Sequence, residues 1–189
     1  MFSSEDINAA LKVLRANGII LYPTDTIWGL GCDATSQEAV EKLLRIKPRD
    51  INKSLLILVN SEQMLERYVH EIPEIAFELL SVTEDPLTIV YPWGKNLAKG
   101  ICSEDGSVGI RICHEEFCEE LITRFRKPLV STSANFTGKP SPLYFDEIDK
   151  ELVDSVDYVV KYRQDDRQKR SASPVIKLNS DGSIKIIRK

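Results

Sequence analysis

Short apolar runs alternate with amphipathic segments along most of this chain, and this alternation limits the folds that it can adopt. Between the runs, apolar residues recur at helical spacing, as Ile7, Leu11 and Leu14 do. Strands that alternate with helices are typical of an α/β domain, and closely spaced C-terminal runs add antiparallel pairs. We therefore predict one domain, residues 1–189, with a twisted mixed parallel and antiparallel sheet flanked by helices. The runs predicted as strands are 19–22, 54–59, 87–91, 108–113, 129–131, 156–160, 175–178 and 184–187.

Capping residues and prolines set the expected helix ends. Ser36 begins a helix that Pro48 stops, and Pro73 divides residues 61–81 into two short helices. Other helices are expected from Ser3 or Ser4 to Gly18, over 115–126 and over 146–152.

Composition excludes several classes of protein. With 189 residues, 42% hydrophobic and 29% charged, the chain is an ordinary globular protein. Its net charge of −4 argues against a protein that coats nucleic acid but permits a local basic cleft. We find no apolar window of membrane-spanning length and no signal-peptide pattern. The four cysteines lack paired spacing, so we expect free thiols in a reduced, cytoplasmic protein.

The most informative polar segment is PLVSTSANFTGKPSP, residues 128–142. An apolar lead-in gives way to small hydroxyl and amide side chains, and a turn follows at Gly138. Small residues let a ligand approach the backbone, and hydroxyl and N–H groups point at its oxygens. The segment alone fits an oxyanion site and an ordinary polar loop equally well.

A second polar segment, YPTDTIWGLGCDA at 22–34, leaves a predicted strand. Thr24, Asp25 and Thr26 precede an expected bend at Gly29-Leu30-Gly31. Two hydroxyls and a carboxylate suit a small ligand that carries an amine and a hydroxyl, and a structural turn is the alternative. It lacks the glycine patterns of phosphate-binding and dinucleotide-binding loops.

Cations gather in a third segment, where Lys47, Arg49 and Lys53 follow a predicted helix end. Three cations in a loop can surround a triphosphate. The alternative is that they complement the helix dipole.

Arg111 interrupts an apolar strand pattern, SVGIRI at 107–112. A buried arginine pairs with a carboxylate of the fold or binds an anionic ligand. In the tail, Ser173 precedes a predicted strand and Arg188 follows the last one, and by themselves both fit surface positions.

Familiar nucleophilic and metal chemistry is missing from the pattern. The two histidines, His70 and His114, lie at expected element boundaries, and Cys113, His114 and Cys118 lack a fourth zinc ligand. The remaining lysine, arginine, serine, threonine and asparagine residues can bind phosphates without supplying a nucleophile. Such a set suits transfer between two bound substrates.

Five strings, in this order, resemble the YrdC-like threonylcarbamoyl-adenylate synthases, which act in tRNA modification. They are YPTDTIWGLGCDA, KPRDINKSLLILV, DPLTIVYP, SVGIRI and STSANFTGKPSP. The likeness extends from about Ile19 to Arg188 and is similar to the short, single-domain form. It implies a YrdC-like α/β fold with a concave basic cleft.

The resemblance implies that L-threonine, bicarbonate or carbon dioxide, and ATP with Mg²⁺ give threonylcarbamoyl-AMP and pyrophosphate. A partner complex then modifies an adenosine of tRNA. The implied threonine-binding residues are Thr26, Arg111, Ser131 and Ser173. The implied ATP-binding residues are Lys47, Arg49, Lys53, Ser107, Ser133, Asn135, Ser141 and Arg188, of which Lys47 and Arg49 are the implied catalytic pair. No protein residue is predicted to bind a metal.

The chain departs from the family pattern in three places. Trp28 stands where tyrosine is frequent, and Glu84-Asp85-Pro86 replaces Pro-Gly-Pro, which puts two carboxylates near the nucleotide or moves the loop away. Pro174 replaces the threonine that usually follows the tail serine. Just before it, KYRQDDRQKR at 161–170 is typical of a solvated loop, and its positive charge suggests a mobile basic lid.

Two other functions remain open at this point. One is a double-stranded RNA or tRNA binding protein without catalysis, which the net charge and the lack of stacked aromatics disfavour. Weak tRNA or double-stranded RNA binding is also compatible with the enzyme. The other is a carbamoyl-adenylate-forming maturation domain, which normally belongs to a larger chain rich in cysteine.

Overall fold

The computed structural model describes residues 1–48, 55–179 and 181–189. Its elements, in chain order, are α1 (Ser4–Arg15), β1 (Ile20–Tyr22), β2 (Gly29–Gly31), α2 (Gln37–Ile46), β3 (Leu56–Val59), α3 (Glu62–Leu65), α4 (Glu74–Val82), β4 (Thr88–Tyr91), β5 (Val108–Ile112), α5 (Glu116–Phe125), β6 (Leu129–Val130), β7 (Thr132–Ser133), η1 (Phe145–Glu147), α6 (Lys150–Asp154), β8 (Tyr158–Val159), β9 (Val175–Leu178) and β10 (Ile184–Arg188).

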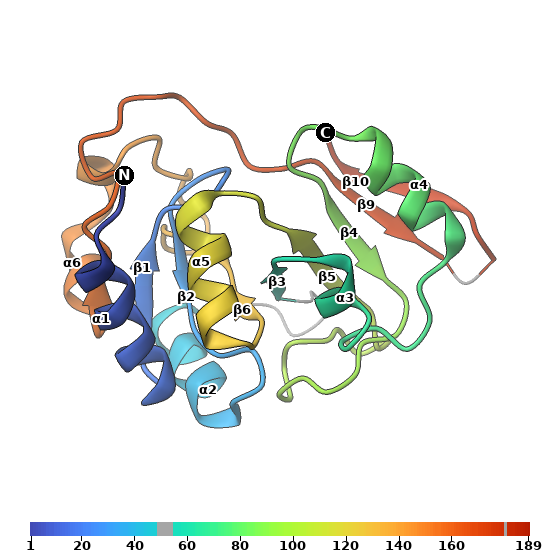
Figure 1. Ribbon diagram of the computed structural model, residues 1–189, viewed down its shortest axis with the longest axis horizontal. Coiled ribbons are helices and arrows are strands. Elements are labelled where there is room, and N and C mark those ends of the chain that lie inside the picture. Colours follow the sequence, from blue (N-terminus) through green and yellow to red (C-terminus); the bar gives the residue numbers. More distant parts are fainter. Residues whose placement is uncertain (49–54, 180) are drawn as a thin grey trace.

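The strands form two mixed sheets, where the sequence analysis expected one. The smaller has the order β7-β2-β1-β8 and the larger has the order β10-β9-β4-β5-β3-β6. Both contain parallel and antiparallel neighbours, such as β1 with β8 and β1 with β2. The predicted α/β class is therefore confirmed, with its strands divided between two layers. In Figure 1, α1 and α6 lie beside the smaller sheet, and α4 lies beside the C-terminal strands of the larger one.

Most predicted helix ends are confirmed by their caps. The Ser3 and Ser36 side chains accept hydrogen bonds from Asp6 N at 3.1 Å and Ala39 N at 3.3 Å. Each bond satisfies one backbone N–H that the first helical turn leaves without a partner. Pro73 is the N-cap of α4, which separates it from α3 as predicted. The single helix expected over 146–152 is instead η1 followed by α6.

The expected bend at 29–31 is wrong, because these residues form strand β2 opposite β1. Gly31 is needed for close packing rather than for a turn. A Cβ atom there would lie 2.5 Å from Tyr22 Cε1 and 2.9 Å from the Val130 carbonyl oxygen. Glycine thus lets the two strands and the fully buried Tyr22 ring pack together.

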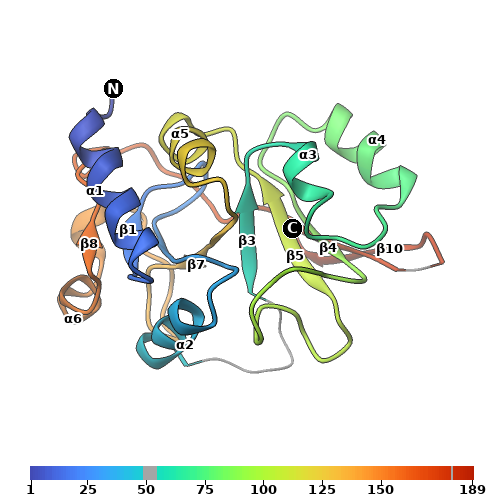
Figure 2. The same cartoon turned by 60° about the horizontal axis from the view of Figure 1, so that its bottom comes forward.

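Ser131 marks the point where the chain passes from one sheet to the other. It lies between β6 of the larger sheet and β7 of the smaller sheet, and its N–H donates to Leu56 O at 2.8 Å. The segment that fits an oxyanion site and an ordinary polar loop equally well therefore begins as a junction between sheets. Figure 2 shows β7 and β3 on neighbouring sides of this junction.

A second long connection joins the sheets, from β8 to β9. Its orange-to-red trace crosses the top of Figure 1 from the smaller sheet to the larger one. Within the described residues, no helix has the length and apolar character needed to cross a membrane. The four cysteines are unpaired, and Cys32, Cys113 and Cys118 are buried.

Candidate active site

A cavity of about 270 Å³ lies between the two sheets. Gly29 of β2 and Ser133 of β7 line it from the smaller sheet, and Thr88 of β4 and Arg111 of β5 line it from the larger one. The structure thus brings together predicted site residues from distant parts of the chain. Those that line the cavity are Thr26, Arg111, Ser131, Ser133, Ser141, Ser173 and Arg188. Its described lining contains no carboxylate.

Arg111 is the most buried charge of the cavity, with 3% of its side chain exposed. Its Nη2 lies 2.8 Å from the Asp25 carboxylate, and Nη1 donates to Ser173 Oγ at 3.3 Å. The contact with Asp25 compensates the charge, but its direction is poor for a hydrogen bond. Arg111 Nε and Nη2 and Asp25 Oδ1 therefore remain without hydrogen-bond partners. The sequence left open whether Arg111 pairs with a carboxylate of the fold or binds an anionic ligand. The fold supplies the Asp25 carboxylate, and two guanidinium nitrogens are still left to donate to an anion.

Ser173 lies within the site despite Pro174 beside it. It is 2% exposed, and its hydroxyl lies 2.7 Å from Thr88 Oγ1. The Pro174 carbonyl accepts from Thr88 N at 3.0 Å, so the proline fits the start of the pairing between β9 and β4. Proline is tolerated here because only its carbonyl is needed in the ladder.

Arg188 adds a second guanidinium to the cavity. Its Nε and Nη2 donate to the Ser173 carbonyl at 3.0 and 2.6 Å. Burial, and then the positive charge of nearby Arg111, lower the pKa of Arg188. Two guanidinium groups around one cavity favour an anionic ligand, which would relieve their mutual repulsion.

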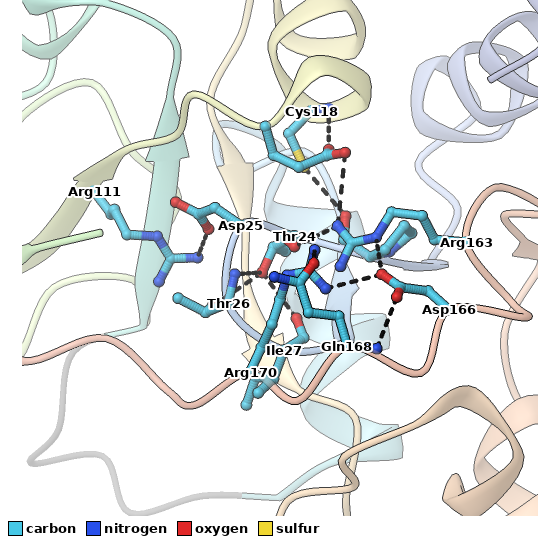
Figure 3. Close-up of polar contacts among 12 residues, drawn as sticks. Thr24, Asp25, Thr26, Ile27, Arg111, Cys118, Arg163, Asp166, Gln168 and Arg170 are labelled. Atoms are coloured by element: carbon cyan, nitrogen blue, oxygen red, sulfur yellow. Dashed lines mark hydrogen bonds and ion pairs between the residues drawn. The ribbon is translucent and has the colours of Figure 1, made fainter. Parts of the chain in front are cut away.

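The loop after β1 carries Thr26 into the cavity. Thr24 Oγ1 accepts from Thr26 N at 3.1 Å, donates to Ile27 O at 2.8 Å and lies 3.0 Å from Thr26 Oγ1. Figure 3 shows the Asp25 carboxylate facing the Arg111 guanidinium from this same loop. Thr24 thus shapes the turn that presents Thr26 to the cavity and Asp25 to Arg111.

Lys47 joins the end of α2 to the segment after β7. Its Nζ donates to the Ser133 carbonyl, to Ser133 Oγ at 3.0 Å and to Asn135 Oδ1 at 3.2 Å. The predicted residues Lys47, Ser133 and Asn135 therefore form one cluster. Arg49 and Lys53, predicted beside them, lie outside the described residues.

Ser107 is buried but does not line the cavity. Its hydroxyl donates to Asp105 Oδ1 at 2.6 Å. The Lys177 ammonium, followed by Ser107, holds the pKa of Asp105 at about 2. Here Ser107 is part of a turn before β5, and its role toward ATP stays a prediction.

A second cavity, of about 560 Å³, meets the first at the Arg111–Asp25 pair, because Asp25 lines it. Glu84 and Asp85 line it too, so the substituted turn faces this cavity and not the one that holds Ser133. Its carboxylates would repel phosphates, so we assign the candidate site to the smaller cavity.

Comparison with known proteins identifies the family of this chain. A sequence model of the Sua5/YciO/YrdC group, described as "Telomere recombination", matches residues 12–189. The chain belongs to the Sua5/YciO/YrdC family. The resemblance seen in the five motifs is therefore confirmed.

One curated relative in this family is the threonylcarbamoyl-AMP synthase of Pseudoalteromonas translucida (strain TAC 125). It is 34% identical over 163 residues, which cover 85% of this chain and 87% of the relative.

Solved structures of the family share the fold. P. abyssi Sua5 complexed with L-threonine superposes with a TM-score of 0.80 at 28% identity, over 91% of this chain and 50% of that one. The chain thus spans about half the length of that protein. E. coli YciO superposes with a TM-score of 0.83 over 99% of this chain and 90% of that one; at 23% identity this shows the fold alone.

Two residues in or beside this cavity are not among those predicted from the sequence. Thr88 is one, since a threonine in an apolar strand looks like a packing residue. Arg163 is the other, because it lies in the charged run expected to be solvated. It is only 14% exposed and donates to Thr24 O at 2.9 Å. Charge composition alone does not show which member of such a run is buried.

Proposed function

We propose that this chain is an L-threonylcarbamoyladenylate synthase, a nucleotidyltransferase that supplies the threonylcarbamoyl group for tRNA modification. The observation that carries the proposal is the buried Arg111 guanidinium, whose Nε and Nη2 lack hydrogen-bond partners at the cavity. A carboxylate is the ligand that fits such a fork best. The relatives named threonylcarbamoyl-AMP synthase, and Sua5 in complex with L-threonine, support threonine as the source of that carboxylate.

The amino acid occupies the buried end of the cavity. Arg111 binds the threonine carboxylate, and Asp25, 2.8 Å from Arg111, holds that guanidinium from the side of the second cavity. Hydroxyl groups of Thr26, Ser131 and Ser173 complete the polar contacts.

The nucleotide occupies the open end. Lys47, Ser133 and Asn135 form a cluster beside the cavity, and Ser141 and Arg188 line it. The resemblance to the family adds Arg49, Lys53 and Ser107 to the ATP-binding set. Lys47 and Arg49 act on the reaction by stabilising the negative charge that moves onto the leaving phosphates.

The reaction needs no protein nucleophile. The threonine amine, once deprotonated, adds to carbon dioxide derived from bicarbonate and forms a carbamate. A carbamate oxygen then bonds to the α-phosphorus of ATP, the bond from that phosphorus to its bridging oxygen breaks, and pyrophosphate leaves. The protein contributes position and charge stabilisation, which the serines and cations of the cavity supply.

Mg²⁺ enters this proposal with the phosphates. The described lining of the cavity has no carboxylate, and the described residues contain no cluster of acidic, histidine or cysteine side chains suited to a metal ion. Phosphate oxygens and water would then hold the ion, which neutralises phosphate charge. The product passes to a tRNA-modifying partner complex, with at most weak direct tRNA or double-stranded RNA binding through a basic cleft.

Pyrophosphate release with ATP, bicarbonate and threonine tests the function. We expect release that depends on threonine, and serine or no amino acid as the control. Release with ammonium and bicarbonate, which supply carbamate, in place of threonine and bicarbonate would favour the carbamoyl-adenylate maturation reaction. Tight RNA binding without release would favour the RNA-binding alternative and contradict the proposal.

A further inference from the structure

The loop that carries Asp25 and Thr26 is fixed by side chains from outside it. The Cys118 thiol donates to Pro23 O at 3.3 Å, and Arg163 Nη1 donates to Thr24 O at 2.9 Å. Backbone carbonyls of such a loop need partners once they are removed from water. Two distant segments, α5 and residues 161–170, therefore supply the partners that the loop lacks.

Arg163 has an unusual backbone. Its φ of +63° lies in the left-handed region, which costs a residue with a Cβ atom roughly 1 kcal/mol. A conformation of this kind persists where the surroundings hold it, and such positions concentrate at functional sites. This backbone turns the Arg163 side chain back toward the loop after β1 (Figure 3).

The Arg163 guanidinium joins three partners from different elements. Besides Thr24 O, it contacts Asp166 at 3.0 Å and Glu115, the N-cap of α5, at 3.6 Å. Only 14% of the arginine side chain is exposed. A planar fork that holds three groups fixes their relative positions, which a single contact would not do.

The partners of Arg163 are themselves held in place. Asp166 accepts from Gln168 N and from Arg170 Nη1, each at 2.8 Å. The Gln168 N–H, followed by the Arg163 and Arg170 side chains, keeps the pKa of Asp166 at about 2. At neutral pH this carboxylate is ionised and pairs with Arg163. The expectation that residues 161–170 form a solvated loop is thus wrong for this central part.

Asp6 of α1 anchors the start of the same segment. It is 2% exposed and accepts from Lys161 N at 3.0 and 3.1 Å and from Tyr162 N at 2.9 Å. The segment is therefore tied to the N-terminal helix on one side and to the loop after β1 on the other.

We infer that Arg163 is a positioning residue for the amino-acid end of the site, acting through the backbone of the Thr24–Thr26 loop. Without its bond to Thr24 O, Asp25 and Thr26 would shift relative to Arg111, which β5 holds independently. Threonine binding would weaken more than ATP binding, because Lys47 bonds to Ser133 and Asn135, which lie outside the Thr24–Thr26 loop. The identity of threonine as the substrate rests on the proposed function, whereas the role of Arg163 in fixing the loop does not.

Arg163→Gly tests the inference, because glycine adopts the left-handed backbone freely and only the side chain is lost. Arg126→Gly is a matched control: Arg126 also has φ +63°, is exposed and caps α5 away from the cavity. Arg163→Lys keeps one charge without the fork and should give an intermediate result. Thermal unfolding of each variant shows whether it is folded.

Two measurements are read together. We expect amide hydrogen exchange at Thr26, whose N–H donates to Thr24 Oγ1, to become about 10-fold faster in Arg163→Gly, and the KM for threonine to rise about 10-fold, with the KM for ATP within about 2-fold. Arg126→Gly should change neither. Unchanged exchange and unchanged threonine KM in folded Arg163→Gly would overturn the inference. Equal increases in both KM values with unchanged exchange at Thr26 would also overturn it, in favour of a general structural role.

The exchange measurement separates this inference from the proposed function. A wild-type protein without threonine-dependent pyrophosphate release would refute the function, and exchange at Thr26 would still decide whether Arg163 holds the loop.

Discussion

The two ends of the cavity are built differently. At the amino-acid end, Arg111, Ser173, Thr26 and Ser131 are all buried. Ser173 contacts Thr88 of β4 and Arg111 of β5, and Arg111 also contacts Asp25 in the loop after β1. At the nucleotide end, the side chains are more accessible, and Ser141 is exposed. The first end is buried, and the described part of the second is more open, with Lys47 half-buried.

The difference suggests how the two substrates are distinguished. Burial strengthens each electrostatic contact and raises the cost of a polar group without a partner, so the amino-acid end should be selective. Exposed cations bind phosphates with less demand on geometry. Specificity should therefore reside at the Arg111 end and charge stabilisation at the Lys47 end.

Removing Arg111 should separate the two ends most strongly. In Arg111→Ala we expect threonine-dependent pyrophosphate release to fall about 100-fold or more, because the Asp25 carboxylate loses its buried partner and threonine loses its fork. ATP affinity, measured by calorimetry, should change little. Arg111→Lys retains the charge but not the fork and should recover only part of the activity. A comparable loss of ATP affinity would show that the ends are not independent.

In contrast to Arg111→Ala, Lys47→Ala should weaken the binding of ATP more than the binding of threonine. We expect a rise of about 10- to 100-fold in the KM for ATP, the range for loss of a charge-assisted hydrogen bond, with threonine binding unchanged. Lys42→Ala is the control, since Lys42 lies in the same helix and pairs with Glu38 at the surface. Weaker threonine binding in Lys47→Ala would contradict the assignment of Lys47 to the nucleotide end of the cavity.

Ser173→Ala probes the hydrogen bonds around Arg111 without removing a charge. The hydroxyl contacts Arg111 Nη1 and Thr88 Oγ1, so its loss should raise the KM for threonine by about 3- to 10-fold. Ser171→Ala, two residues away and exposed, should behave as wild type. An unchanged KM for threonine in Ser173→Ala would mean that the backbone of this segment, and not the hydroxyl, matters.

The smallest expected difference between the two ends is in their response to salt, which is measured on the unmodified protein. Raising the ionic strength from about 0.05 M to 0.5 M shortens the screening length severalfold and should raise the KM for ATP about 3-fold more than that for threonine. Initial rates at each salt concentration give both constants. Equal sensitivity would contradict the contrast between a buried and an exposed end.

Local patterns in the sequence predicted much of the fold. Caps at Ser3 and Ser36 and the break at Pro73 fixed helix ends, because these effects act over a few residues. The strand at 29–31 was missed because its glycines indicate a turn locally, whereas their reason is contact with Tyr22 and Val130. Contacts of that kind depend on strands that are distant in the chain.

The site divides in the same way. Arg111 was visible because a charge in an apolar strand needs a partner. Arg163 was not visible, since its neighbours in the sequence are also charged and only burial distinguishes it. The roles of Ser173 and Arg188 came from family resemblance, and the structure places both beside the cavity.

By itself, the sequence determined the α/β class, most helix ends and a site chemistry of arginine, lysine and small hydroxyls, because propensity and charge are local properties. Tertiary structure decided that the strands form two sheets, that Ser131 lies at their junction, and that Arg111 meets Ser173 across 62 positions. It also decided which member of the charged run holds the loop after β1. Strand pairing and burial make these choices, and both depend on residues far apart in the chain.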